Sequence, residues 1–336
     1  MKTAFPFVWV LAYLLTACVD KEKKPIDETP EEPAKKMVLK PCPAFSGDSA
    51  YDFVAAQVKF GPRVPNSAPH KQCKDYFYAQ FSKFGFSPII QNFEATAYNG
   101  TKLTSYNVIA SYNPKATKRI LLAAHWDTRP YNDKEATDST QFKPIDGAND
   151  GASGAGVLLE IARTIAQAEK KPTVGIDIIL FDSEDYGHPE HHKGGSAEYW
   201  CLGSQYWAKN KHKPDYTAYY GILLDMVGAK DAKFYREGTS LQYARDVTYS
   251  IWEIGNALGF THYFKNLDSP ALTDDHLFVN TIAKIPMLDI IEFDPSGGES
   301  YFAKYHHTLN DNMQIIDKNT LKAVGQTVLQ ALYNED

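Results

Sequence analysis

The feature that most constrains the fold is the stretch 119–167, in which a buried strand ends on a histidine and a helix begins near an aspartate. Residues 120–124 form the continuous apolar run Ile-Leu-Leu-Ala-Ala, and His125 follows at once. Asp150 stands within Gly-Ala-Asn-Asp-Gly-Ala-Ser-Gly (147–154), after which apolar residues recur at helical spacing. In α/β proteins, ligands gather beyond the carboxyl ends of parallel strands. The stretch therefore predicts an α/β fold that presents His125 and Asp150 to one site.

The rest of the chain alternates apolar strand patterns with helical patterns. Further strands are predicted over residues 89–93, 107–110, 176–181, 220–224 and 286–291. Helices are predicted over residues 52–58, 70–84, 157–165, 242–258 and 321–333. Asn99-Gly100, a strong two-residue hairpin signal, joins the first two strands. We therefore expect a single α/β domain with a mixed, mostly parallel central sheet of about six strands, flanked by helices.

The N-terminus has the features of an export signal. Residues 5–15 are almost all apolar, about half of the ~20 residues that a membrane-spanning helix needs, and they fit a signal peptide. The ending Leu-Thr-Ala-Cys at 15–18 resembles a bacterial lipobox, in which Cys18 becomes the lipidated N-terminus. The alternative is an ordinary signal peptide with a cysteine near its end.

The three predicted segments of the chain are a lipoprotein signal peptide (1–18), a flexible tether (19–44) and a catalytic α/β domain (45–336). The tether is assigned because residues 20–36 are rich in Lys, Glu and Pro and have too few apolar residues to fold. We expect an exported protein, a periplasmic or cell-surface lipoprotein that contacts the membrane through its lipid.

Charge and cysteine content exclude several classes of protein. The chain has 35 basic and 41 acidic residues, a net charge of −6, and no basic run, so we expect no nucleic-acid partner. Its four cysteines are too few and too scattered for a disulfide scaffold or a cysteine zinc site. A disulfide between Cys42 and Cys73 is one alternative, although sequence cannot pair them.

Polar residues that a core would not choose follow the predicted strands or stand at loop and helix entrances. They are His125, Asp150, Glu184, Asp185, Asp225, Asp274, Asp289, His306 and His307. Carboxylates and imidazoles are the ligands of zinc in sites without thiolates. Taken singly, Asp150 could be only a helix cap, Asp225 could pair with Arg129, and the two adjacent histidines could be exposed. Gathered at the strand ends of one sheet, the set favours a metal site.

Six motifs occur in an order that resembles zinc-dependent aminopeptidase-like proteins of family M28 and, more narrowly, the animal-type glutaminyl cyclases and their bacterial lipoprotein forms. The motifs are His-Trp-Asp (125–127), the Gly-rich segment 147–154, Phe-Asp-Ser-Glu-Asp (181–185), Leu-Asp-Met-Val-Gly (224–228), Asp-Asp-His (274–276) and His-Thr-Leu-Asn-Asp-Asn (307–312). Phe-Gly-Pro-Arg-Val-Pro (60–65) is also similar. The resemblance covers residues 54–333 and implies the zinc aminopeptidase-like fold.

The resemblance implies one zinc ion per chain, held by Asp150, Asp185 and His307. It also implies Glu184 as the proton shuttle. The remaining expected site residues are Asp225 and Asp274 as catalytic acids, and Trp200, Phe302 and Asp289 in substrate binding. For the two aromatic residues, plain packing is the alternative.

This chain departs from the animal enzymes at three positions. Asp185 stands where they have a longer glutamate, and Asp289 stands where they have a histidine. His306 occupies the position of a tryptophan. One wall of the pocket is therefore expected to be built differently.

The reaction that the resemblance implies is cyclisation of the N-terminal glutamine of peptides to pyroglutamate, with release of ammonia. Zinc would polarise the γ-carboxamide, and Glu184 would move the proton of the attacking amine. Asp225 and Asp274 would share a proton, since two adjacent carboxylates do not easily both ionise. We expect a monomer that acts on peptides and proteins with N-terminal glutamine.

Two alternatives remain open. In a two-zinc aminopeptidase, His125 and Asp225 would bind a second zinc ion and Asp150 would bridge the pair. In a non-enzymatic surface lipoprotein, the same cleft would only bind peptides. The ligand residues by themselves do not distinguish the first alternative from a cyclase.

Overall fold

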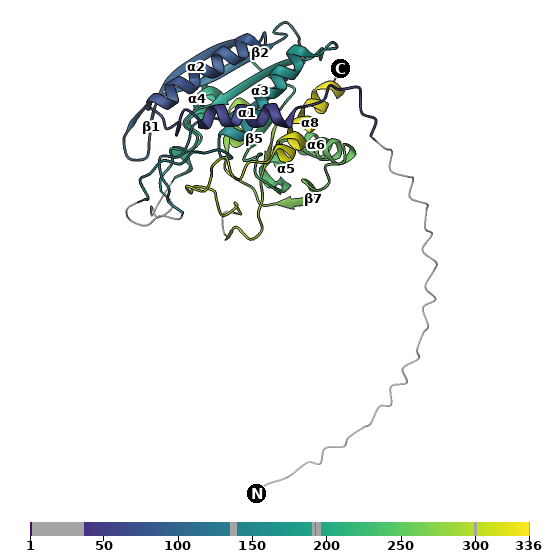
Figure 1. Cartoon of the computed structure of the whole chain (residues 1–336). Coiled ribbons are helices and arrows are strands. Elements are labelled where there is room, and N and C mark those ends of the chain that lie inside the picture. Colours follow the sequence, from purple (N-terminus) through teal and green to yellow (C-terminus); the bar gives the residue numbers. More distant parts are fainter. Residues whose placement is uncertain (2–36, 135–139, 190–191, 193–195, 299–300, 336) are drawn as a thin grey trace. The chain divides into compact units, whose positions relative to one another are not determined.

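The computed structural model describes residues 1, 37–134, 140–189, 192, 196–298 and 301–335, and residues 37–336 form one compact unit (Figure 1). The predicted signal peptide and most of the predicted tether lie outside the described residues. Within the described part, no helix has the length and apolar character that crossing a membrane requires. Residues 37–44 are described, and Met37, Leu39 and Cys42 pack against the core.

A six-stranded mixed sheet forms the centre of the unit. Its strands, in spatial order, are β1 (Ser87–Thr96), β2 (Lys102–Tyr112), β4 (Gly175–Phe181), β3 (Arg119–His125), β5 (Tyr220–Asp225) and β8 (Met287–Ile291). The hairpin β1–β2 pairs antiparallel to β4, whereas β4, β3, β5 and β8 run parallel. This confirms the predicted mixed, mostly parallel sheet. It also places the carboxyl ends of the four parallel strands at one edge.

Helices cover both faces of the sheet, which gives three layers (Figure 1). The first face is covered by α1 (Gly47–Val58), α2 (Ala68–Lys83), α3 (Ala152–Gln167), α6 (Arg245–Ala257) and α8 (Lys318–Asn334). On the second lie α4 (Leu202–Lys209), the short α7 (Asp275–Phe278) and a π-helix (Val279–Ala283). Successive side chains of β3 point to opposite faces of the sheet: Ile120 and Leu122 pack in the core of the first face, and Leu121 packs in that of the second.

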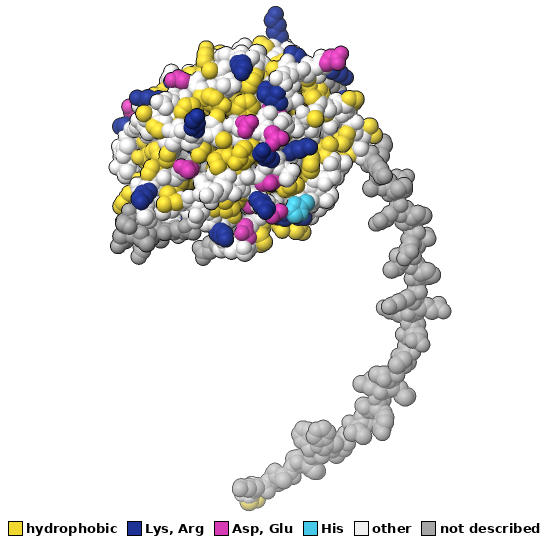
Figure 2. Space-filling model, in the orientation of Figure 1, with side chains coloured by type: hydrophobic (Ala, Val, Ile, Leu, Met, Phe, Trp, Pro, Cys, Tyr) yellow, Lys and Arg dark blue, Asp and Glu magenta, His cyan; other side chains and the backbone are white. Residues whose placement is uncertain are grey.

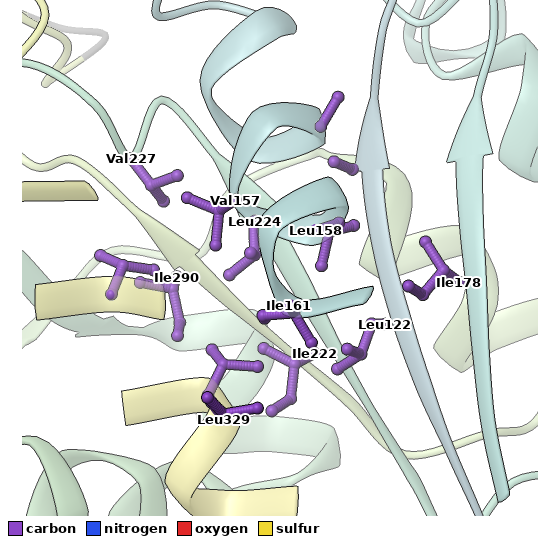
Figure 3. Packing of buried hydrophobic residues seen from close by; sticks show 14 of the residues in the cluster. Leu122, Val157, Leu158, Ile161, Ile178, Ile222, Leu224, Val227, Ile290 and Leu329 are labelled. Carbon is purple, nitrogen blue, oxygen red and sulfur yellow. The ribbon is translucent and has the colours of Figure 1, made fainter. Parts of the chain in front are cut away.

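The first core cluster fills the space between α3, α8 and the sheet (Figure 3). Here α3 lies so close to β5 that a Cβ on Gly154 would stand 2.2 Å from the carbonyl oxygen of Leu224. Only glycine allows this approach. It brings the N-terminal end of α3, and with it Asp150, onto the carboxyl ends of β3 and β5.

The predicted helix over 242–258 is wrong in one respect. The chain forms α5 (Gly238–Tyr243) and then α6, with a break at Ala244, whose backbone is not helical (φ −137°, ψ 36°). A small two-stranded parallel sheet of β6 (Phe234–Glu237) and β7 (Phe264–Ser269) was not predicted. Both strands are short and their sequences lack a clear apolar alternation, so the local pattern carries little signal.

Cys42, Cys73 and Cys201 are free thiols, so the alternative of a disulfide between Cys42 and Cys73 is not realised. Burial raises the pKa of both Cys42 and Cys73 to about 12, which keeps these thiols protonated and unreactive. Figure 2 shows one face of the molecule, on which Lys and Arg side chains are interspersed with Asp and Glu.

Candidate active site

Side chains at the ends of two parallel strands line one cavity: Glu184 and Asp185 follow β4, and Asp225 ends β5. His125, which ends β3, does not line the cavity but contacts Asp150 and Asp225, which do. The cavity has a volume of about 340 Å³. It is lined by Asp150, Glu184, Asp185, Ala197, Trp200, Asp225, Met226, Leu272, Thr273, Asp274, Ile291, Phe302, His306 and His307. Most of the residues predicted for the site are therefore brought together.

Two of the three predicted zinc ligands, Asp150 and Asp185, each approach the third, His307. His307 Nε2 is 3.1 Å from Asp185 Oδ1 and 3.6 Å from Asp150 Oδ2. Two ligand atoms of a tetrahedral zinc ion lie roughly 3.3 Å apart, because each is ~2.0 Å from the metal. Asp150 Oδ2 and Asp185 Oδ2 are buried without a hydrogen-bond partner among the described residues. The orphaned Oδ2 of Asp150 faces His307 Nε2 and fits a bound zinc ion, and Asp150, His306 and His307 each offer one ligand atom within 4.8 Å of the others.

His306 is a further candidate ligand; the sequence placed it among the side chains that favour a metal site, although the family resemblance assigned the zinc ion to other residues. Its ring stacks on that of His307, with 3.6 Å between the centroids, and its Nε2 lies 3.8 Å from Asp150 Oδ2. Burial holds the pKa of both histidines well below the usual value. His307 lowers the pKa of His306 further, and Arg129 lowers that of His307. Neutral imidazoles are the form that binds metal. The adjacent pair of histidines was the only sequence signal for this role.

His125 lies on the opposite side of Asp150. Its Nε2 is 3.0 Å from Asp150 Oδ1 and 3.1 Å from Asp225 Oδ1. Burial alone would lower the pKa of His125, but the carboxylates of Asp225, Asp127 and Asp150 raise it well above its usual value. The two oxygens of Asp150 therefore face different histidines. His125, Asp150 and Asp225 also lie close enough together to hold a second metal ion.

The Glu184 carboxylate lies close to both His125 and Asp274. Its Oε1 accepts a hydrogen bond from Cys201 Sγ at 3.1 Å, and its Oε2 lies 4.0 Å from His125 Nδ1. Burial raises the pKa of Glu184 well above its usual value, and nearby Asp185 adds to the effect. Burial likewise raises the pKa of Asp225 to about 7. Acids of this kind can exchange protons near neutral pH.

Two carboxylates that the sequence did not single out fix the backbone of the ligands. Asp127 accepts the N–H groups of Glu184 and Asp185, at 3.0 and 3.2 Å. Asp311 accepts the N–H group of Asp150 at 3.0 Å. Both belong to motifs that carried the family resemblance, so the motifs themselves were the available signal.

Two buried arginines complete this framework. Arg129 donates to the carbonyl of Asp185 at 3.1 Å and to its Oδ1 at 3.4 Å, and it forms an ion pair with Asp133. The alternative that Arg129 pairs with Asp225 is therefore wrong. Arg63, from the motif at 60–65, donates to the carbonyl of Gly147 at 2.7 Å and so holds the segment that leads to Asp150.

Trp200 and Phe302 both line the cavity. The Trp200 ring is parallel to that of His307, with an interplanar angle of 4° and 6.1 Å between the centroids. The Phe302 ring lies 4.4 Å from that of His306. Asp289 is different: it is fully buried and is not among the cavity-lining residues. It lies close to Asp274 instead.

Of the ten non-glycine residues with positive φ in the described part of the chain, five lie at the site. They are Ser183 (55°), Cys201 (54°), Met226 (48°), Tyr301 (57°) and His307 (58°). Each is, or directly follows or precedes, a residue that lines the cavity. Such backbone conformations are costly for residues with a Cβ and concentrate at functional sites.

The profile of peptidase family M28 matches residues 107–332. The glutaminyl-peptide cyclotransferase of Bos taurus is 26% identical over 256 residues, which are 68% of this chain and 65% of that enzyme. The alignment thus spans slightly less than two thirds of the bovine protein.

Two solved bacterial structures are more similar. The glutaminyl cyclase of Tannerella forsythia is 49% identical, with a TM-score of 0.85, and the match covers 88% of this chain and all of that one. A protein of Parabacteroides distasonis described as a Zn-dependent exopeptidase is 51% identical, with the same TM-score and coverage. The two descriptions differ in activity and share the fold.

Proposed function

The chain belongs to peptidase family M28, and we propose that it is a glutaminyl-peptide cyclotransferase, an acyltransferase that converts N-terminal glutamine of peptides to pyroglutamate and releases ammonia. The observation that carries this proposal is the 49% sequence identity to the glutaminyl cyclase of Tannerella forsythia over 88% of this chain. The curated cyclotransferases of animals support it independently.

Asp150, Asp185 and His307 would hold one zinc ion, with His306 beside them. Their orphaned oxygens and neutral imidazoles fit such an ion, as described above. When bound, zinc would polarise the γ-carboxamide carbonyl of the substrate. Arg129 and Asp127 orient Asp185, and partners of this kind strengthen the hold of a ligand on its metal.

Glu184 is the group that takes the proton from the attacking α-amine. Its carboxylate lies in the cavity beside Asp185, and its raised pKa gives it a proton affinity suited to this exchange near neutral pH. The proton then passes to the departing nitrogen, which leaves as ammonia. Asp225 and Asp274 line the same cavity and share a proton that they can donate during the transfer. Trp200 and Phe302, which also line the cavity, enclose the glutamine side chain.

The second candidate function is a two-zinc aminopeptidase. One observation favours it: His125, Asp150 and Asp225 lie together in a geometry that could hold a second ion. The protein of Parabacteroides distasonis described as an exopeptidase points the same way. We nevertheless place His125 as a cation that hydrogen-bonds the two aspartates, because its Nε2 lies within hydrogen-bonding distance of both.

A paired assay tests the proposal. A peptide with N-terminal glutamine should release ammonia and lose its free amine without releasing a free amino acid, and metal analysis should find one zinc ion per chain. Release of the terminal residue from leucine or alanine peptides, together with two zinc ions, would establish the aminopeptidase instead. If peptides bind but neither product forms, the protein is a binding lipoprotein.

We also propose that the protein is exported, lipidated at Cys18 and held as a monomer at a membrane surface. The apolar segment followed by Leu-Thr-Ala-Cys supports this. Cys18→Ser should release the protein from the membrane fraction without changing its activity. Retention of the variant in that fraction would argue against a lipid anchor, and light scattering would test the monomer.

A further inference from the structure

Behind the cavity, four buried side-chain atoms without a hydrogen-bond partner among the described residues lie together. They are His276 Nδ1, Asp289 Oδ1, Asp289 Oδ2 and Asp274 Oδ2. His276 and Asp289 are completely buried. One donor or acceptor atom of each of the three residues lies within 4.8 Å of the others, and His276 Nδ1 is 3.9 Å from Asp289 Oδ2. Because buried polar atoms are almost always paired, protons or a bound species must connect these atoms.

The surroundings of Asp289 disfavour its ionised form. Asp225 of β5, Glu237 of β6 and Asp274 at the start of α7 all face it. The one basic side chain directed at it from a neighbouring element, within the described part of the chain, is His276 of α7. Burial and these acids raise the pKa of Asp289 well above its usual value. A protonated carboxyl group at this position can donate a hydrogen bond, as a carboxylate cannot.

His276 is held in one orientation by Glu237. Its Nε2 donates to Glu237 Oε1 at 2.9 Å. Glu237 is fully buried and also accepts the backbone N–H groups of Thr239 at 2.7 Å, Leu272 at 3.3 Å and Ser240. Although burial opposes it, these donors lower the pKa of Glu237 to about 2. With an ionised acceptor on Nε2, the imidazole directs Nδ1 at Asp289, in the way that a carboxylate orients a histidine in metal sites.

We propose that His276, fixed by Glu237, is a positioning residue that orients Asp289, which burial and the surrounding acids keep neutral, so that its O–H group is directed at Asp274. His276 carries a proton on each ring nitrogen: Nε2–H donates to Glu237 and Nδ1–H to Asp289 Oδ2. Asp289 Oδ1–H donates to Asp274 Oδ2. Two protons thus satisfy all four orphaned atoms, after a shift of about 1 Å between His276 and Asp289.

The functional consequence rests on the proposed cyclase reaction, in which Asp274 lines the cavity. A hydrogen bond from a neutral Asp289 holds the Asp274 carboxyl group in place without adding another negative charge. Asp289 is one of the three positions at which this chain is expected to depart from the animal enzymes, and the pair Glu237–His276 gives a reason why an aspartate is tolerated there. Neither Glu237 nor His276 touches the cavity.

Two substitutions of His276 separate positioning from mere structural support. In His276→Asn the amide nitrogen replaces Nδ1 and can still donate to Asp289, but the contact with Glu237 is lost. In His276→Gln the amide reaches Glu237, but no donor faces Asp289. We expect kcat to fall about tenfold or more in His276→Gln and less than about threefold in His276→Asn, with KM unchanged. The midpoint of thermal unfolding should fall in the opposite order.

Asp289→Asn provides the rescue, because its neutral amide can donate to Asp274 without help from His276. Its kcat should fall by about threefold or less, and His276→Gln should cost nothing further in that background. Asp289→Ala should lose the activity that Asp289→Asn retains. Nitrogen-15 spectra of the histidine rings should find both nitrogens of His276 protonated at neutral pH.

Several outcomes would overturn this inference. They are a kcat that follows thermal stability in the two His276 variants, additive losses in the double variant, or a His276 ring with one unprotonated nitrogen. A second metal ion lost on His276→Gln would show that a cation, rather than protons, joins His276, Asp274 and Asp289. If wild-type protein released no ammonia, the proposed function would fail, while the spectra would still decide the state of His276.

Discussion

Cys201 donates a hydrogen bond from its thiol to Glu184, with 3.1 Å between Sγ and Oε1. The thiol is fully buried, and burial raises its pKa well above the usual value, so it is a donor that never ionises near neutral pH. We expect Cys201→Ser to keep kcat within about threefold, because a hydroxyl donates equally well. Cys201→Ala should lower kcat by about tenfold at unchanged KM, since the hydrogen bond that orients the Glu184 carboxyl group is lost. Equal kinetics in the two variants would mean that the thiol only fills space.

Glu184→Gln tests the proton carrier itself. The amide keeps the size of the side chain but cannot accept and return a proton, so kcat should fall by about 10²–10⁴-fold. Zinc content and the affinity for a glutamine peptide should be unchanged, because Glu184 is not one of the expected ligands. Glu253→Gln, on the exposed side of α6, is the matched control and should behave as wild type. Full activity of Glu184→Gln would remove Glu184 from the mechanism.

Arg129 should set the affinity of the site for zinc, because it holds both the carbonyl and the carboxylate of Asp185. A lysine cannot reproduce these contacts together with the bidentate pair to Asp133. In Arg129→Lys, the dissociation constant for zinc, measured by competition with a chelator, should rise by about 10–100-fold. Arg245→Lys, at an exposed position at the start of α6, should leave it unchanged. An unaltered affinity in Arg129→Lys would show that Asp185 needs no such support.

How far the sequence predicts this site depends on the range of each interaction. Strands β3, β4 and β5 were predictable because they are buried on both faces and read as largely apolar runs, which Asp177 interrupts in β4. Once these strands were assigned, the polar residues at or just after their ends, His125, Glu184 and Asp225, could be placed at one edge of the sheet. The contact of His125 with Asp225 joins residues 100 positions apart, and no local pattern encodes which acid a histidine meets.

The roles of Asp127, Asp311 and Glu237 were out of reach for a related reason. Each accepts backbone N–H groups of a distant or irregular segment, and this depends on the path of loops that have no periodic pattern. The break at Ala244 between α5 and α6 is similar, because an alanine is ordinarily a good helix former. Tertiary packing overrides propensity there.

Glu292 should make stability depend on pH. It is buried beyond β8 and accepts hydrogen bonds from Tyr305 and, at 3.4 Å, from Asn149. Burial raises its pKa to about 7, although the bond from Tyr305 lowers it. Because the folded pKa lies above the unfolded one, its contribution is complete below about pH 4.5 and is lost as the pH rises through about 7. The loss in unfolding free energy should reach at most about 3 kcal/mol.

The measurement is urea unfolding at about pH 5 and about pH 8, in wild type and in Glu292→Gln. The difference between the two proteins isolates Glu292 from the other buried acids, several of which have raised pKa values. The variant should lose less stability than wild type between the two values. Glu94→Gln, on the exposed face of β1, is the control, and an identical pH dependence in all three proteins would contradict the prediction.

Trp200 distinguishes substrate binding from plain packing at the cavity wall. Its ring stacks parallel to His307, lies 4.9 Å from the guanidinium of Arg129 and donates from Nε1 to His188. If the exposed part of the ring covers the glutamine side chain, Trp200→Ala should raise KM roughly tenfold with a smaller change in kcat, and Trp200→Phe should restore part of the loss. Zinc content must be measured in parallel, because His307 is one of the expected ligands. A loss of zinc or of thermal stability at unchanged KM would assign Trp200 to packing, which is the alternative that the sequence left open.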